Sequence, residues 1–188
     1  AGTVTTIPQD KAERAGDPTV TTAEVQAAMR GLPRSSAPGP DGVPYDLWLL
    51  GDLLWAPLVA RLFSAIAHTN SMPASFHRGT ITPILKPDCD PLQPASYRPI
   101  TLLPTLYRLL TRILATRFDC AMCDAISPAQ SAYLSKRLIA DNVLFTSLLP
   151  HVLTALGIPG ATVFLDISKA FDSVIRNFLF QVMHVMGA

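Results

Sequence analysis

The chain has 188 residues, of which 49% are hydrophobic and 15% charged, with a mean hydropathy of +0.31 and a formal net charge of +1. This length allows one domain, or one and a part, with a sizeable core. Because no stretch approaches the roughly 18 consecutive apolar residues that cross a bilayer, we expect no membrane span. The 3 cysteines occur without a secretory signal, which predicts a reduced compartment and no disulfide framework.

The charge is unevenly distributed along the chain. Residues 1–77 hold five basic and seven acidic side chains, whereas residues 78–117 hold six basic and two acidic ones. A basic middle suits an anionic partner such as a nucleic acid or a triphosphate, although a solvated helix face would have the same composition.

The amino-terminal residues 1–20 lack periodicity and predict a linker. Thr21 and Glu24 then have the spacing of a capping box, which predicts a short helix to about Met29. Val25, Met29 and Leu32 would lie on one face of this helix.

Residues 33–44, PRSSAPGPDGVP, are rich in Pro, Gly and Ser and predict a loop. Gly39 and Gly42 permit backbone conformations that other residues avoid, and Asp41 can accept hydrogen bonds from nearby amides. The loop could be a surface linker. Alternatively, with Arg30 and Arg34 beside it, its amides could approach a phosphate backbone.

Two helices are predicted over 44–55 and 57–68, each with a proline in its first turn. Their apolar row is expected to lie in the core and consists of Leu47, Leu50, Leu54, Leu58, Leu62 and Ile66.

Residues 80–86 and 97–103 are short apolar runs that predict an antiparallel pair with a long tip. Lys86 stands at the inner end of the tip and Arg98 near the start of the return strand. The two side chains could converge on one anion, for which a triphosphate is the natural candidate. They could equally be edge-strand charges that discourage aggregation.

Residues 106–122 are the clearest predicted helix. Its apolar face is expected to hold Leu106, Leu109, Leu110, Ile113, Leu114 and Phe118. Its arginines, Arg108, Arg112 and Arg117, either contact a nucleic-acid backbone or solvate the helix, and the pattern favours neither. Cys120 and Cys123 at helical spacing are interpreted as two buried thiols rather than as half of a zinc site.

Further helices are predicted over 129–133, after Ser127-Pro128, and over 139–156, with Pro150 as a kink. Residues 161–167 then predict a buried strand that ends in an acid, Asp166. A buried carboxylate needs a partner or a metal. Asp166 and Asp172 could therefore hold a divalent cation, or could simply cap the turn and the amphipathic helix predicted over 174–186.

Taken in order, six blocks resemble the reverse transcriptase of non-LTR (LINE-type) retrotransposons. The blocks are APGPDGVP (37–44), ITPILKPD (81–88), YRPITLLPTLYRLLTRILATR (97–117), QSAY (130–133), ADN (140–142) and VFLDISKAFDSV (163–174). The resemblance covers roughly residues 22–188. A group II intron-type maturase shares the fold, but the APGPDG and YRPITLL blocks are more similar to the LINE type.

The resemblance implies a mostly helical α+β fold with a small antiparallel hairpin, which is part of a right-hand polymerase. Residues 1–20 would be a linker and residues 21–77 an amino-terminal extension with a template-contacting loop. Residues 78–160 would be the fingers, and residues 161–188 the first strand and helix of the palm.

The resemblance also implies a role for each candidate site residue. Asp166 would bind both catalytic Mg²⁺ ions, and the Ile167 carbonyl would ligate one of them. Lys86 and Arg98 would bind the incoming dNTP, and Phe171 would reject a 2′-hydroxyl by its size. The nucleic-acid contacts would be Arg34, Gly39, Asp41, Gly42, Arg108 and Arg112.

The sequence departs from the family pattern at two places. Ala132 and Lys136 stand where relatives usually have glycine, which puts the local bend in doubt. The family's second catalytic pair lies in a later Asp-Asp hairpin, and no Asp-Asp dipeptide occurs in this chain.

We therefore expect the amino-terminal half of an RNA-directed DNA polymerase that is inactive alone. Its partners would be an RNA template, a DNA primer, a dNTP and the remainder of the polymerase, with no membrane. The resemblance places the parent element inside the cell, in the nucleus. The alternative is a decayed or co-opted fragment that binds RNA without catalysis.

Overall fold

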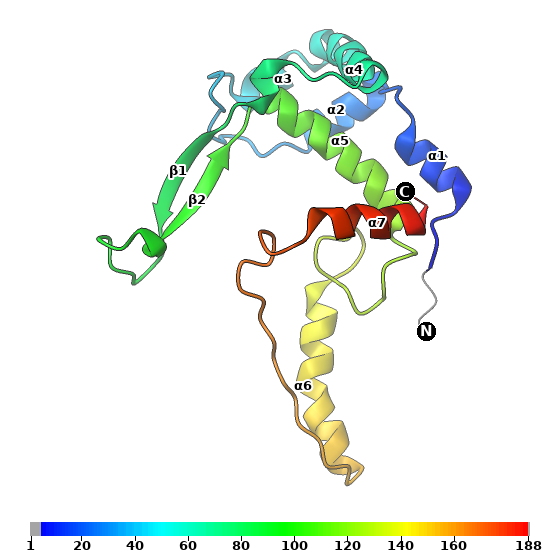
Figure 1. Cartoon of the computed structure of the whole chain (residues 1–188), viewed down its shortest axis with the longest axis vertical. Helices are drawn as coiled ribbons and strands as arrows, with labels where there is room; N and C mark the ends of the chain where they lie inside the picture. Colours follow the sequence, from blue (N-terminus) through cyan, green and yellow to red (C-terminus); the bar gives the residue numbers. More distant parts are fainter. Residues whose placement is uncertain (1–4, 188) are drawn as a thin grey trace. The chain divides into compact units, whose positions relative to one another are not determined.

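The computed structural model describes residues 5–187, which form α-helices, two short 3-10 helices and one two-stranded sheet (Figure 1). The α+β class with a small antiparallel hairpin is therefore confirmed. The chain divides into two compact units. Asp17–Thr116 forms one, hereafter the first unit, and the residues before Asp17 join those from Arg117 onward to form the second. No helix among the described residues is both long enough and apolar enough for a membrane span.

Each unit has its own set of elements. The first unit contains α2 (Thr22–Arg30), α3 (Tyr45–Leu50), α4 (Asp52–Thr69), η1 (Ala74–His77), β1 (Thr80–Leu85), η2 (Pro94–Ser96), β2 (Tyr97–Leu102) and most of α5 (Thr105–Met122). The second unit contains α1 (Gln9–Gly16), the end of α5, α6 (Ile139–Ala155) and α7 (Arg176–Met186).

Helix α2 begins where the sequence predicts. The Thr21 side chain accepts a hydrogen bond from the Glu24 amide at 3.2 Å, and the Glu24 carboxylate accepts one from the Thr21 amide at 2.8 Å. This reciprocal pair satisfies two amides that the first turn leaves free. The expected apolar face is confirmed, since Val25, Met29 and Leu32 are all buried.

The boundary between α3 and α4 lies at Gly51 and not at Pro57 as predicted. The Gly51 carbonyl accepts hydrogen bonds from the amides of Leu54 and Trp55, at 3.0 and 2.9 Å, and so starts the helix earlier. Pro57 lies inside α4. Because Pro57 has no N–H, it cannot donate a hydrogen bond to the carbonyl of Leu53, which is an exposed residue.

The prediction of the core face of α3 and α4 was wrong for four of its six residues. Leu47, Leu50, Leu54 and Leu58 are exposed, and only Leu62 and Ile66 pack against the core. The buried face consists of Ala56, Val59, Ala60 and Phe63. Because α4 is apolar on several sides, its sequence pattern does not identify the side that meets α2.

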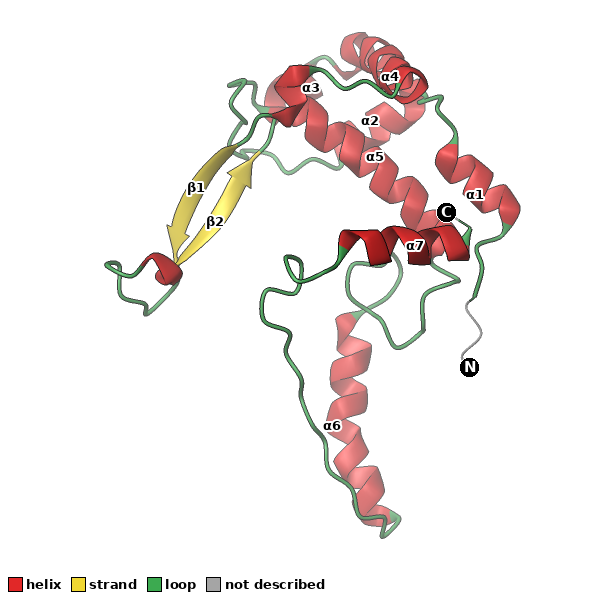
Figure 2. Cartoon of the chain, viewed as in Figure 1, coloured by secondary structure: helices red, strands yellow, loops and turns green. Residues whose placement is uncertain are grey.

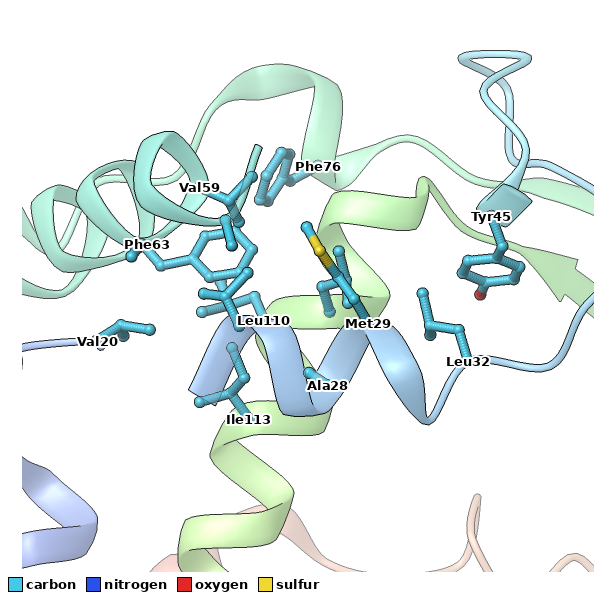
Figure 3. Close-up of a cluster of buried hydrophobic side chains, with 14 residues drawn as sticks. Val20, Ala28, Met29, Leu32, Tyr45, Val59, Phe63, Phe76, Leu110 and Ile113 are labelled. Atoms are coloured by element: carbon cyan, nitrogen blue, oxygen red, sulfur yellow. The ribbon is translucent and has the colours of Figure 1, made fainter. Parts of the chain in front are cut away.

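The core of the first unit gathers around Phe63, which is fully buried (Figure 3). Met29 from α2, Phe76 from η1, and Leu110 and Ile113 from α5 belong to the same cluster. Helix α5 thereby confirms most of its predicted apolar face, although Leu114 is exposed. The cluster joins α2, α3, α4, η1 and α5, and it holds the first half of α5 against α2 and the start of the loop that follows α2.

The predicted hairpin is confirmed. β1 and β2 pair antiparallel, with Ile84 opposite Arg98 and Leu85 opposite Tyr97. Every residue of β1 is exposed. The ladder continues one step beyond the strands, because the Lys86 amide donates to the Ser96 carbonyl at 2.8 Å.

The second unit has a small core of its own. Ile7, Ala121 and Met122 are buried, and Ala12, Ala15, Phe118 and Met186 pack against them. The Ile7 amide also donates to the Met186 carbonyl at 2.7 Å. Residues 9–16 thus form α1 where the sequence predicted an irregular linker. The interpretation of Cys120 and Cys123 as two buried thiols was wrong, because Cys120 is exposed and Cys123 is partly exposed.

A surface ion pair joins α1 to the residues after α5. Lys11 Nζ lies 2.5 Å from Asp124 Oδ2. The hydrogen bond from Lys11, aided by one from the Cys123 thiol, lowers the pKa of the Asp124 carboxyl, and the bond to Asp124 raises the pKa of Lys11. The pair is exposed, so its effect is small.

The pKa shift of Asp124 gives a pH dependence with a defined sign. Since the folded pKa is lowered, the pair stabilises the fold above the unfolded carboxyl pKa, about 3.9, and this stabilisation disappears as the pH falls through the folded pKa. We expect Asp124→Asn to lower the thermal unfolding midpoint slightly at pH 7 and by less at pH 3, measured by far-UV circular dichroism. Asp88→Asn, on the hairpin tip, is the matched control. An equal loss for Asp124→Asn at both pH values would contradict the assignment.

The strand predicted over 161–167 is absent. These residues are exposed and irregular, and they belong to the long loop between α6 and α7 (Figure 2). An extended segment becomes a strand only when neighbouring backbones satisfy its amides and carbonyls. Within residues 5–187, β1 and β2 pair with each other, and nothing pairs with 161–167.

Candidate functional site

The glycine-rich loop 37–44 is fixed against the start of α5. A Cβ built on Gly39 would lie 2.5 Å from the carbonyl carbon and oxygen of Leu103, so a side chain there would collide with backbone. The Thr105 hydroxyl donates to the Val43 carbonyl at 2.9 Å. The loop therefore meets residues 103–105 at two points of close contact.

The tip of the same loop is a tight turn that faces open space. The Gly42 amide donates to the Gly39 carbonyl at 3.0 Å, and the Val43 amide donates to Asp41 Oδ1 at 3.3 Å. The predicted ability of Asp41 to accept a hydrogen bond from a nearby amide is thus confirmed. Gly42 has a φ of +68° and no atom within 4 Å of its Cβ position, so conformation and not crowding requires glycine there. Arg34, before the loop, is exposed.

The side chains of the two candidate arginines of α5 contact other parts of the first unit. The Arg108 guanidinium lies over the Tyr45 ring, 5.3 Å from its centroid, and donates to the Tyr45 hydroxyl. The Arg112 guanidinium occupies the space beside Gly31, where a Cβ would approach its Nη2 within 2.3 Å. The sequence identified both arginines, but it gave no sign that Tyr45 and Gly31 receive them.

The hairpin places Lys86 and Arg98 on one face. Arg98 lies opposite Ile84, and Lys86 is two residues beyond Ile84, so the alternation of a strand points both side chains to the same side. The Lys86 ammonium donates to the Ala95 carbonyl at 2.7 Å, which ties it to the tip. Arg98 is exposed. This face of the hairpin therefore presents the Arg98 guanidinium to solvent, and the Lys86 ammonium is held at its edge.

Asp166 and the residues after it lie in an exposed segment. Among the described residues the Asp166 carboxylate has neither a hydrogen bond nor an ion pair, and Ile167 beside it is also exposed. The expectation of a buried Asp166 was therefore wrong. The chain turns at Lys169, whose carbonyl accepts hydrogen bonds from the amides of Asp172 and Ser173.

Asp172 does not cap the helix that follows. The N-cap residue of α7 is Ile175, and no side chain makes a capping hydrogen bond there. Phe171 is 82% exposed, and its ring makes an edge-to-face contact with Tyr133, with the ring centroids 6.4 Å apart. The fold thus brings the turn after Asp166 next to the QSAY block.

Arg137 organises the QSAY block, and the sequence analysis missed it. Its guanidinium donates to four carbonyls, those of Cys123, Ile126, Ser127 and Gln130, at 2.5–2.9 Å. Turns, and not the predicted helix, occupy residues 129–133. The available signal was an arginine between a Pro-containing loop and a helix start.

The backbone bend that the sequence put in doubt is present at the end of the QSAY block and just after it. Lys136 has a φ of +63° and Tyr133 a φ of +62°, both in the left-handed region. Lys136 occupies one of the positions where the resemblance leads us to expect glycine, so the bend is present without it, at a cost of about 1–2 kcal/mol. The side-chain Nδ2 of Asn142 donates to the Ala129 carbonyl at 3.1 Å and to the Ser131 hydroxyl at 2.9 Å, which anchors the block to α6.

The donor set around Asp166 fits Mg²⁺ in part. The Asp166 carboxylate and the Ile167 carbonyl are hard oxygen ligands of the kind that Mg²⁺ prefers. Over the described residues, no group of three His, Cys, Asp or Glu side chains gathers to hold a metal ion. One carboxylate supplies one ligand position and leaves most of the coordination shell to other donors.

Residues 84–188 match the family described as reverse transcriptase (RNA-dependent DNA polymerase). The uncharacterized 149 kDa protein of transposon TX1 from Xenopus laevis is 27% identical over 173 residues, which cover 92% of this chain and 13% of that protein. The Pol polyprotein from the type-1 retrotransposable element R2 of Popillia japonica is 30% identical over 168 residues, 87% of this chain and 22% of the polyprotein.

The RNA-directed DNA polymerase from the mobile element jockey of Drosophila funebris is 36% identical over 99 residues, which cover 52% of this chain and 11% of that polymerase. This chain thus spans between 11% and 22% of the length of these three curated relatives. Since the family match extends over more than half of the 188 residues, the chain belongs to the reverse transcriptase family, and its relatives are proteins of non-LTR retrotransposons.

Proposed function

We propose that the chain is part of an RNA-directed DNA polymerase of a non-LTR retrotransposon. The observation that carries the proposal is the family match over residues 84–188, which encloses Lys86, Arg98, Asp166 and Phe171. In its support, the Asp166 carboxylate is exposed and forms no ion pair with any arginine or lysine of residues 5–187. A carboxylate in that state is available to a metal ion.

In this proposal Asp166 is the catalytic carboxylate, and it binds Mg²⁺ together with the Ile167 carbonyl. Two bound ions would supply positive charge that activates the primer 3′-hydroxyl and stabilises the leaving pyrophosphate. The contribution of the chain itself is to hold two oxygen ligands next to each other, directly before the turn that the hydrogen bonds to the Lys169 carbonyl close.

The nucleotide would be bound by Lys86 and Arg98 from one face of the hairpin. Lys86 would exchange its hydrogen bond to the uncharged Ala95 carbonyl for one to a phosphate oxygen, in which both partners are charged. Phe171, with its exposed ring steadied by Tyr133, would lie under the sugar and exclude a 2′-hydroxyl by its bulk. The bound molecule would be a dNTP.

The loop 37–44, with Arg34 beside it, would contact the RNA template. In its support, the tip has an exposed glycine, Gly42, which would let a backbone phosphate come close. We assign residues 21–77 to the extension that carries this loop, residues 78–160 to the fingers and residues 161–188 to the start of the palm. A DNA primer completes the set of nucleic-acid partners.

The remainder of the polymerase chain is the proposed partner of residues 161–167. In support, this segment has the composition of a buried strand, and Val163, Phe164 and Leu165 are all exposed. Strands of the missing palm would satisfy its backbone groups and cover these side chains.

The first experiment is primer extension by the 188-residue chain alone, on an RNA template with Mg²⁺ and dNTPs. We expect no incorporation above that of an Asp166→Ala chain, because one carboxylate cannot offset the repulsion of two metal ions. Incorporation that exceeds this control would overturn the prediction.

The competing function, RNA binding without catalysis, is separated by the parent reading frame. An intact Asp-Asp hairpin downstream supports the polymerase, whereas a stop codon supports a relic. In either case binding to an RNA oligonucleotide should weaken steeply as salt rises, since contacts to phosphates release counterions.

A further inference from the structure

Three contacts join the loop 37–44, hereafter the template loop, and Tyr45 after it to Leu103 and the first turn of α5. Gly39 lies against the Leu103 backbone, Thr105 donates to the Val43 carbonyl, and Arg108 stacks on and donates to Tyr45, which directly follows the loop. Thr105 and Arg108 are three residues apart and so lie on one face of the helix. The loop is thus anchored on its inner side, while Asp41 and Gly42 face outward.

Loss of the hydrogen bond of either Thr105 or Tyr45 would destabilise the anchor of the template loop. Thr105 is 1% and Tyr45 is 2% exposed, so each hydroxyl would be left without a partner away from water if its bond were lost. Arg108 contributes a flat, charged group that fits the Tyr45 ring and satisfies its hydroxyl in one orientation. Arg112, one turn further along, lies beside Gly31 instead.

We infer that Thr105, Arg108 and Tyr45 are positioning residues for the template loop, and that Arg108 acts on RNA binding through Tyr45 and not by contacting a phosphate. The part that concerns RNA rests on the proposed function. The part that concerns the loop does not, and the two are measured separately.

The first measurement is hydrogen exchange of the loop amides in the full 188-residue chain, without RNA. We expect Tyr45→Phe, Arg108→Lys and Thr105→Val each to speed exchange across 39–43 by about five- to tenfold, since each removes one hydrogen bond of the anchor. Thr105→Ser, which keeps the hydroxyl, and Arg61→Gln, an exposed arginine of α4, should exchange as the wild type does. The fluorescence of Trp48 and Trp55 checks that the first unit remains folded.

The second measurement is the affinity for a single-stranded RNA oligonucleotide at several salt concentrations. Tyr45→Phe and Arg108→Lys keep the charge, so we expect both to weaken binding about fivefold without changing the slope against log salt. Arg34→Gln should instead lower the slope by about 0.7, as one lost phosphate contact does, and leave loop exchange unchanged. The Tyr45→Phe/Arg108→Lys double variant should be no weaker than either single one.

Two results would overturn the inference. One is wild-type loop exchange in both Arg108→Lys and Tyr45→Phe. The other is an Arg108→Lys chain that binds RNA as the wild type does, while Arg108→Gln lowers the salt slope as Arg34→Gln does, because a lysine can replace an arginine at a simple phosphate contact. If the wild-type chain binds no RNA, the proposed function fails, and the exchange result still decides the anchoring role.

Discussion

Replacing Phe63 with alanine is expected to lower the free energy of unfolding of the first unit by about 3–5 kcal/mol. Phe63 is fully buried at the centre of the cluster that joins α2, α4, η1 and α5, so the lost ring leaves a cavity that its neighbours cannot fill. The measurement is urea unfolding followed by tryptophan fluorescence. Trp48 and Trp55 are the 2 tryptophans of the chain, and both lie in the first unit, so the signal reports on that unit.

Leu50→Ala is the matched control, because the sequence pattern placed Leu50 in the core and the structure leaves it 86% exposed. We expect it to change the unfolding free energy by no more than about 0.5 kcal/mol. A loss for Leu50→Ala as large as that for Phe63→Ala would mean that the helices α3 and α4 present the opposite face to the core.

The second large effect is expected at Asp166 in a longer polymerase that contains this chain and the downstream Asp-Asp hairpin. Asp166→Ala should lower primer extension on an RNA template by about a hundredfold or more, since removal of a direct metal ligand exceeds the 10- to 100-fold loss typical of a residue behind one. Asp172→Ala should cost less, because Asp172 neither caps α7 nor, in our proposal, binds a metal.

Asp166→Asn keeps the size of the side chain and removes its charge, so it separates metal binding from packing. It should lose activity as Asp166→Ala does, while both variants bind the RNA template with wild-type affinity. Retention of activity within threefold in Asp166→Asn would argue against the metal-binding role of Asp166.

Elements with local signals could be predicted from the sequence. The capping box at Thr21 and Glu24 begins α2 where predicted, and the two short apolar runs form β1 and β2. Helices α5, α6 and α7 lie within about two residues of their expected bounds. Each of these depends on contacts between residues close in the chain, or on an apolar stripe that is unambiguous.

The missed features depend on partners that are distant in the sequence. The segment 161–167 has the composition of a strand, but no other described segment pairs with it. The core face of α4 is decided by α2 and α5, since Phe63 and Leu58 are equally apolar. The helix expected at 129–133 is replaced by turns, and Arg137 joins the residues around them through hydrogen bonds that the sequence does not predict.

In the candidate site, too, the residue types could be predicted from the sequence, whereas the contacts between distant residues could not. The resemblance supplied Asp166, Lys86, Arg98 and the loop 37–44 as residue types in order. It could not supply the Tyr45 hydroxyl as the partner of Arg108, or the contact of Tyr133 with Phe171, because these pairs are set by side-chain packing. The functional roles of these residues stay predictions that the experiments above decide.

The unpaired stretch after α6 has a practical consequence for anyone who purifies this polypeptide. Residues 161–165 are uncharged, rich in β-branched and aromatic side chains, and free of proline, which is the composition of an aggregation-prone window. Both backbone edges of that window are open to another copy, so self-association should grow with protein concentration. Dilute samples, or co-expression with the downstream strands, would keep the polypeptide monomeric.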